Sequence, residues 1–121
     1  MATRVAINGF GRIGRAFFRI AWDDPEVEVV HINDLAKDEM LAHLLVHDSV
    51  QGHWAHDVKV TPEGIVVDGT LIGTSVERDP TNLPWSAKNV DVVLEATGVF
   101  RSRDKAALHL QAGAKKVIIS E

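Results

Sequence analysis

The apolar positions of the chain form short runs that alternate with helical stripes. The run Val5–Ile7 ends at an Asn-Gly pair, and a short apolar run bounded by turn residues is typical of a buried strand. The segment Ile13–Trp22 carries apolar residues at i, i+3, i+4, i+7 and i+8, so it predicts an amphipathic helix. Val27–Ile32 then predicts a second strand, and Leu35–Val46 predicts a second helix.

Each predicted helix has an apolar face that we expect to pack on a sheet. The stripe of the first helix consists of Ile13, Ala16, Phe17, Ile20 and Ala21. The stripe of the second helix consists of Met40, Leu41, Leu44 and Leu45. The large aromatic residues of the first helix, which are Phe17, Phe18 and Trp22, are expected in the core.

The pattern changes in the middle of the chain. Three short β-type runs follow one another there: Val58–Val60, Ile65–Val67 and Thr70–Val76. An Asp-Gly pair separates the second run from the third, and such a pair between apolar runs is a strong hairpin signal. This segment is therefore predicted to form an antiparallel excursion.

The strand-helix-strand pattern returns near the end of the sequence. Val90–Leu94 predicts a strand, Ser102–Gln111 a helix and Val117–Ile119 a last strand. Ser102 suits the N-cap of this helix, and Gly113 suits its C′ position. Strands that alternate with helices predict an α/β fold with a doubly wound, mostly parallel sheet, into which the antiparallel hairpin is inserted. We expect residues 1–121 to form one domain.

Composition narrows the classes of protein to consider. The 121 residues are 45% hydrophobic and 25% charged, which is ordinary for a folded domain and weighs against disorder or a coiled coil. The net charge of −4 argues against nucleic acid or an anionic membrane as the main partner. The absence of cysteine excludes disulfides and a thiol nucleophile in this chain and fits a cytoplasmic location.

The candidate chemistry begins directly after the first predicted strand. Gly9, Gly11 and Gly14 form a G-x-G-x-x-G motif that opens the first helix. In the dinucleotide-binding fingerprint, the first glycine permits the tight turn and the second lets the backbone approach a pyrophosphate. The third allows close packing of helix and strand. The motif alone is weak, but its place in a β-α-β unit predicts a Rossmann-type domain.

Two further features of this unit point to NAD. The backbone amides of Arg12 and Ile13, at the start of the helix, are the natural donors to a pyrophosphate. Asp34 lies 20 residues after Gly14, at the end of the second strand, where a carboxylate accepts hydrogen bonds from the adenosine ribose. Its charge would repel a 2′-phosphate, so we expect NAD to be preferred over NADP. The alternative is a glycine turn that merely packs, with Asp34 as a helix cap.

Six segments, in order, resemble phosphorylating glyceraldehyde-3-phosphate dehydrogenase. They are residues 5–15, 32–34, 48–52, 77–80, 95–100 and 113–120. The related erythrose-4-phosphate dehydrogenase shares much of this pattern. The sequence departs from the family at Gln51, where His is usual, and at Glu121, where Ala is more common.

The resemblance implies further cofactor contacts. Asn33 would lie beside Asp34, Arg78 near the adenine, Thr97 and Gly98 along the cofactor, Phe100 nearby and Ser120 at the nicotinamide end. Each has a plain structural alternative: a surface charge for the arginine, a strand end for the Thr-Gly pair and a core position for the phenylalanine.

The resemblance also implies that this chain supplies only the cofactor-binding part of the family enzyme. In the intact family enzyme, a cysteine beyond these residues forms a thiohemiacetal, and hydride passes to NAD. We therefore expect this chain to bind NAD without dehydrogenase activity, as a fragment that lacks the catalytic domain. Its partners would be that domain or further copies in a homo-oligomer. The alternative is a non-enzymatic nucleotide-binding or protein-interaction module.

Three histidines cluster near the middle of the chain: His47, His53 and His56. A cluster of imidazoles raises the possibility of a metal site or a general base. Because no metal-binding spacing accompanies them, we expect solvated or hydrogen-bonded histidines and no metal.

Overall fold

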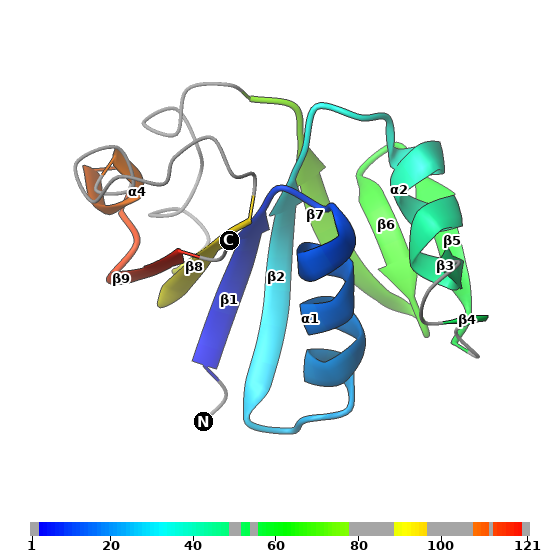
Figure 1. Ribbon diagram of the computed structural model, residues 1–121, viewed down its shortest axis with the longest axis horizontal. Coiled ribbons are helices and arrows are strands. Elements are labelled where there is room, and N and C mark those ends of the chain that lie inside the picture. Colours follow the sequence, from blue (N-terminus) through cyan, green and yellow to red (C-terminus); the bar gives the residue numbers. More distant parts are fainter. Residues whose placement is uncertain are drawn as a thin grey trace.

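The computed structural model describes residues 3–48, 52–53, 56–77, 89–96, 108–111 and 113–119. Its main feature is a seven-stranded sheet in the order β5-β6-β7-β2-β1-β8-β9 (Figure 1). Five of its strands are β1 (Thr3–Asn8), β2 (Val27–Asn33), β7 (Thr70–Ser75), β8 (Val92–Glu95) and β9 (Lys116–Ile119). All neighbours among these five strands pair in parallel.

The order β7-β2-β1-β8-β9 matches the first five positions of the Rossmann order 3-2-1-4-5-6. The chain moves outward from β1 to β2 and β7 and then crosses back to β8 on the other side of β1. The predicted α/β fold class, a mostly parallel doubly wound sheet with an antiparallel insertion, is confirmed.

The antiparallel insertion consists of β5 (Val58–Thr61) and β6 (Gly64–Val67), which extend the sheet beyond β7. Between β6 and β7, Asp68 has φ 50° and Gly69 has φ 85°. Positive φ at both central residues is the feature of a type I′ hairpin turn, so the Asp-Gly signal is confirmed. A separate two-stranded ribbon, β3 (His47–Asp48) with β4 (Gly52–His53), was not predicted.

Helices α1 (Arg12–Trp22) and α2 (Asp38–Val46) pack through one hydrophobic cluster. Phe18 is fully buried there, edge-to-face with Phe10 and stacked on Trp22. A second cluster contains Ala6, Val30, Val90, Val93 and Ala114. Helix α4 (Leu108–Gln111) precedes Ala114 and β9. Residues 102–107 of the predicted third helix lie outside the described residues.

The predicted apolar stripe of α1 is wrong at two of its positions. Ile20 is 75% exposed and Ile13 is also exposed, whereas Ala21 is buried and Phe17 packs against the core cluster, as predicted. Gly14 and Phe18 also face the core. Gly14 must face the sheet because an added Cβ would lie 2.4 Å from the Gly9 carbonyl oxygen. This close approach fixes the rotation of the helix about its axis.

The second helix shows the same kind of difference. It begins at Asp38 rather than Leu35, and it buries Leu41 and Leu45 while Met40 is exposed. Arg19 of α1 explains part of this packing. Its guanidinium is buried and donates to the Leu45 carbonyl oxygen at 2.6 Å and 3.1 Å, so it binds the last turn of α2.

None of the helices in the described part of the chain is long and apolar enough to cross a membrane.

Candidate functional site

The carboxyl ends of the parallel strands meet at one edge of the sheet, which we call the nucleotide edge. It comprises the ends of β1, β2, β7 and β8 together with the turn that leads into α1 (Figure 1). In open α/β sheets, ligands bind outside the carboxyl ends of the strands, where the strand order reverses. Here that reversal lies between β1 and β8. From β1 the chain continues to β2 on one side, and from β8 it continues to β9 on the other side.

The glycine turn occupies the centre of this edge. Gly9 has φ 95°, a left-handed conformation that favours glycine, and its N–H donates to the Asn33 carbonyl oxygen at 2.8 Å. Gly14 lies against the turn so closely that a side chain would strike the Gly9 carbonyl and Ile7. Gly11 differs, because an added Cβ there would meet no atom within 4 Å. The turn is therefore crowded toward the sheet and open at Gly11.

Helix α1 presents its amino terminus at this open side. Gly11 is the N-cap and supplies no side-chain cap, and the first turn contains no acidic residue. The first backbone bond along the helix is from Arg15 N–H to the Gly11 carbonyl oxygen, at 2.9 Å. The amides of Arg12 and Ile13 precede it, and such amides at a helix start are suited to an anion.

Asp34 connects the end of β2 to the glycine turn. Its carboxylate accepts a hydrogen bond from the Phe10 N–H at 2.6 Å through Oδ2, and one from the Ala36 N–H at 2.9 Å through Oδ1. The side chain is half-buried. These two bonds orient the carboxylate beside the turn and leave it further lone pairs for a ligand hydroxyl.

Asn33 lies directly before Asp34 but is turned into the protein. Its side chain is buried, and its Oδ1 accepts bonds from Ser75 Oγ at 2.7 Å and from Glu77 N–H at 3.0 Å. Its Nδ2 donates to the Glu77 carbonyl oxygen at 2.8 Å and to Asn8 Oδ1 at 2.7 Å. The structure thus places the Asn33 side chain beneath the nucleotide edge, in contact with β1 and with the chain after β7.

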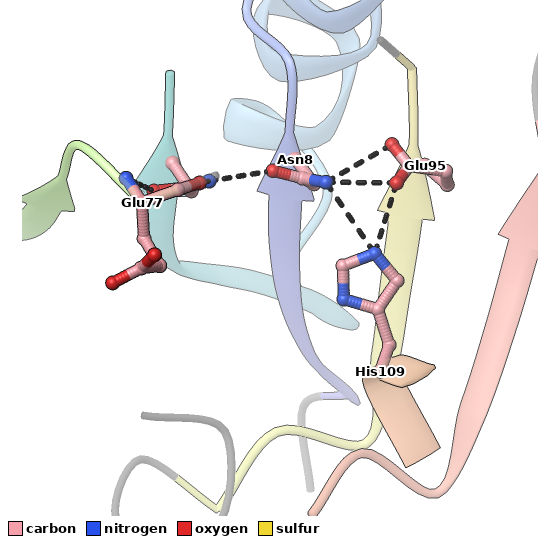
Figure 2. A network of polar contacts seen from close by, with 5 residues as sticks. Asn8, Glu77, Glu95 and His109 are labelled. Carbon is pink, nitrogen blue, oxygen red and sulfur yellow. Dashed lines mark hydrogen bonds and ion pairs between the residues drawn. The ribbon is translucent and has the colours of Figure 1, made fainter. Parts of the chain in front are cut away.

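The polar contacts continue across the sheet to α4, as Figure 2 shows. Asn8 Nδ2 donates to both oxygens of Glu95, at 2.7 Å and 3.1 Å. His109 Nε2 lies 2.9 Å from Glu95 Oε1. Glu95 is 1% exposed and His109 is 0% exposed. We call Asn8, Asn33, Glu95 and His109 the buried network.

The buried network was not predicted as a unit. The sequence pattern places Glu95 only within a family segment and predicts no role for His109. One signal was available, since Asn8 and Glu95 each end an apolar run whose neighbours are buried, and a polar residue there needs a partner. The identity of the partners was not available from the runs themselves.

Several predicted contacts cannot be compared with the structure. Arg78, Thr97, Gly98, Phe100 and Ser120 lie outside the described residues. The structure brings together Gly9, Gly11, Arg12, Ile13, Gly14, Asn33 and Asp34 at the edge. The strands that lead to residues 78 and 97 end at this same edge.

The contacts that the structure describes for the three clustered histidines differ. His47 pairs in register with His53 across the β3–β4 ribbon. His56 instead contacts Asp68, whose Oδ2 lies 2.6 Å from His56 Nδ1. Among the described residues, no group of three or more His, Cys, Asp or Glu could hold a metal ion.

We call Asp68, His56 and Trp22, with the Asp57 N–H, the exposed cluster. Asp68 accepts from Trp22 Nε1 at 3.1 Å through Oδ2 and from the Asp57 N–H at 3.0 Å through Oδ1. The Asp57 N–H, followed by the bonds from His56 and Trp22, holds the pKa of Asp68 below its ordinary value of 3.8. These bonds join α1 to the hairpin.

Comparison with known proteins agrees with this arrangement of the edge. Residues 3–103 match the family model described as glyceraldehyde 3-phosphate dehydrogenase, NAD binding domain. The chain is 56% identical over 120 residues to glyceraldehyde-3-phosphate dehydrogenase 1 of Bacillus subtilis. That match covers 99% of this chain and 36% of the relative.

Two further relatives come from distant organisms. The glyceraldehyde-3-phosphate dehydrogenase of Thermotoga maritima is 56% identical over 119 residues, covering 97% of this chain and 36% of that protein. Glyceraldehyde-3-phosphate dehydrogenase 3 of Saccharomyces cerevisiae is 50% identical over 118 residues, covering 97% of this chain and 36% of that protein. The chain therefore spans about a third of the length of these curated relatives.

Proposed function

The chain belongs to the glyceraldehyde 3-phosphate dehydrogenase family as its NAD-binding domain, and from that premise we propose that these 121 residues bind NAD by themselves at the nucleotide edge. The observation that carries this proposal is the junction of the glycine turn with Asp34. The Asp34 carboxylate is held 2.6 Å from the Phe10 amide, beside the open start of α1. Sites for a ribose and for a pyrophosphate are thus adjacent.

The residues fit a dinucleotide in three ways. The open space at Gly11 admits the close approach of a phosphate to the backbone, and the amides of Arg12 and Ile13 would donate to it. Asp34 would accept from the adenosine ribose hydroxyls. A 2′-phosphate would bring negative charge against this carboxylate, so we propose a preference for NAD over NADP.

The remaining cofactor contacts are proposed from the family. Arg78 would lie near the adenine, Thr97 and Gly98 would line the path to the nicotinamide, and Phe100 and Ser120 would lie toward its far end. Asn33 would support Asp34 from below rather than touch the ribose, because its amide already bonds to Asn8, Ser75 and Glu77.

Calorimetric titration of the chain with NAD and NADP tests the proposal. We expect NAD to bind more tightly than NADP, and Asp34→Ala to weaken NAD binding by about tenfold, the effect of losing a hydrogen bond to a charged group. Asp68→Ala is the matched control, because it removes an equal charge from the exposed cluster and should leave binding unchanged. Absence of NAD binding by the unmodified chain would overturn the proposal.

We also propose that the chain does not oxidise aldehyde phosphates alone. NAD would accept the hydride, but the chain contains no cysteine to form the covalent intermediate that the family uses. Mixing the chain with NAD, an aldehyde phosphate and inorganic phosphate should therefore give no absorbance change from NADH. A steady rate above background from the purified chain would contradict this.

Apolar side chains on the outer strand indicate where a partner would pack. Ile118 of β9 and Leu110 of α4 are exposed, and β9 is an outer strand of the described sheet. We propose that this side of the chain packs against the family's catalytic domain or against another copy of the chain. We also propose that the protein is located in the cytoplasm.

A non-enzymatic interaction module is the second candidate function. Light scattering that shows a stable monomer would argue against self-association.

A further inference from the structure

Three members of the buried network end the strands that lead to proposed cofactor contacts. Asn8 precedes Gly9, and Asn33 precedes Asp34. Glu95 lies two positions before Thr97. Every strand that delivers a proposed contact near the centre of the edge therefore ends in a side chain of this network.

The hydrogen bonds of the network have one consistent direction. The Glu77 N–H and the Ser75 hydroxyl donate to Asn33 Oδ1, so the other atom of that amide is the donor, Nδ2. Asn33 Nδ2 donates to Asn8 Oδ1, which turns Asn8 Nδ2 toward Glu95. An ionised Glu95 only accepts, and it receives from Asn8 and from His109 Nε2.

Burial makes this arrangement restrictive. Asn8 and Asn33 are each 3% exposed, and Glu95 and His109 less. Water has little access to replace a missing donor, so moving one strand end would leave a buried polar atom without its partner. The network therefore adds side-chain bonds to the backbone pairing of β1 with β2 and β8, and it restricts how the ends of these strands can move.

A purely stabilising role would not require polar residues here. Apolar side chains of similar volume often replace a buried ion pair with no loss of stability. What polar partners add is a specified distance and direction between strand ends. A dinucleotide requires that precision, because its adenosine half and its nicotinamide half are held by different strands.

We propose that Asn8, Asn33, Glu95 and His109 are positioning residues for the dinucleotide. They hold the glycine turn and Asp34, which would serve the adenosine half, at a set distance from the end of β8, the strand that leads to the proposed nicotinamide contacts. His109 takes part from α4, through its contacts with Glu95 at 2.9 Å and with Asn8 at 3.4 Å. This inference rests on the proposed NAD site and names the residues that give it its span.

The test compares NAD with ADP, which carries only the adenosine half. His109→Ala removes a donor from Glu95 and loosens β8 relative to β1, so it should lower NAD affinity by about tenfold and ADP affinity by less than about twofold. His109→Gln is the conservative control, because its amide can donate to Glu95 again. It should restore most of the NAD affinity.

The outcomes separate this inference from the proposed function. If the unmodified chain binds neither nucleotide, the proposed function fails. If it binds both, and His109→Ala weakens NAD and ADP equally or changes neither, the positioning role is wrong and the network is only structural. Circular dichroism melting of each variant verifies that the binding measurements are made on folded protein.

A second variant guards against a His109→Ala chain that does not fold. Asn8→Asp keeps the shape of the side chain but places a carboxylate against Glu95, with His109 as the other titratable group at this point. Two facing carboxylates repel each other, so this variant should lower NAD affinity by about tenfold and ADP affinity by less than about twofold. Equal losses of NAD and ADP affinity, or no loss of either, would overturn the proposal.

Discussion

The buried network and the exposed cluster are built from the same chemistry in two different settings. Each has a carboxylate that accepts several hydrogen bonds, one of them from a histidine. The His56–Asp68 contact is 2.6 Å, shorter than the 2.9 Å of His109–Glu95. The side chains of the exposed pair, however, are 29% and 40% accessible, against 0% and 1% for the buried pair.

The comparison shows that the shorter distance does not identify the pair that contributes more to stability. Water and salt screen the exposed pair, and water replaces either partner when it is lost. Water cannot replace a lost partner of Glu95 in this way, because this carboxylate is buried and depends on Asn8 and His109. The same bonds therefore join two elements loosely in one place and fix strand ends in the other.

Removal of each carboxylate partner is the strongest test of this difference. His109→Ala or Asn8→Ala leaves Glu95 buried with one donor fewer, and we expect a loss of about 3–5 kcal/mol in the free energy of unfolding. His56→Ala in the exposed cluster should have a much smaller effect. Urea unfolding followed by circular dichroism measures both. Equal losses would show that burial does not distinguish the two clusters.

Glycine substitutions extend the comparison from side chains to backbone. Gly14→Ala should cost about 3 kcal/mol in stability, because its methyl group would press on the Gly9 carbonyl at the buried edge. Gly69→Ala, in the turn beside Asp68, meets no atom within 4 Å and should cost only about 1 kcal/mol, from its φ of 85°. A Gly69 variant less stable than the Gly14 variant would reverse the comparison.

Acid should have the smallest effect, through two carboxylates whose pKa is lowered in the fold. The pKa of Asp91 is lowered by the Arg4 N–H, 3.0 Å away, and by Lys115, as that of Asp68 is lowered by the Asp57 N–H. A lowered pKa in the folded state stabilises the fold above 3.8, and this contribution is lost as the pH falls through the folded value. Thermal melting between pH 5 and pH 2 should show a decline that is shallower in an Asp68→Asn, Asp91→Asn double variant. A decline of unchanged slope would count against these two groups.

The glycine turn and Asp34 could be predicted because their signals are local. The turn needs glycine at Gly9 and Gly14 whatever the rest of the fold does, and Asp34 ends the next apolar run. The hairpin at Asp68 follows from two neighbouring residues in the same way. Short-range steric constraints and the periodicity of helices and strands can be predicted from the order of residues.

The rotation of α1 depended on a close approach inside the glycine turn, and the buried network depended on contacts between distant residues. Periodicity indicated that α1 is amphipathic, but the contact of Gly14 with Gly9 decided that Phe18 rather than Ile20 faces the core. Asn8 and Glu95 are 87 positions apart and meet because β8 returns beside β1.

By itself, the sequence therefore determined the alternation of elements, the glycine turn and the family to which the chain belongs. Only the tertiary structure decided which polar residues lie together beneath the edge. The reason is physical. The residue pattern of a strand predicts that one of its faces is buried, but the partner of a buried polar atom depends on the order of strands in the sheet. That order arises only when the strands pack together.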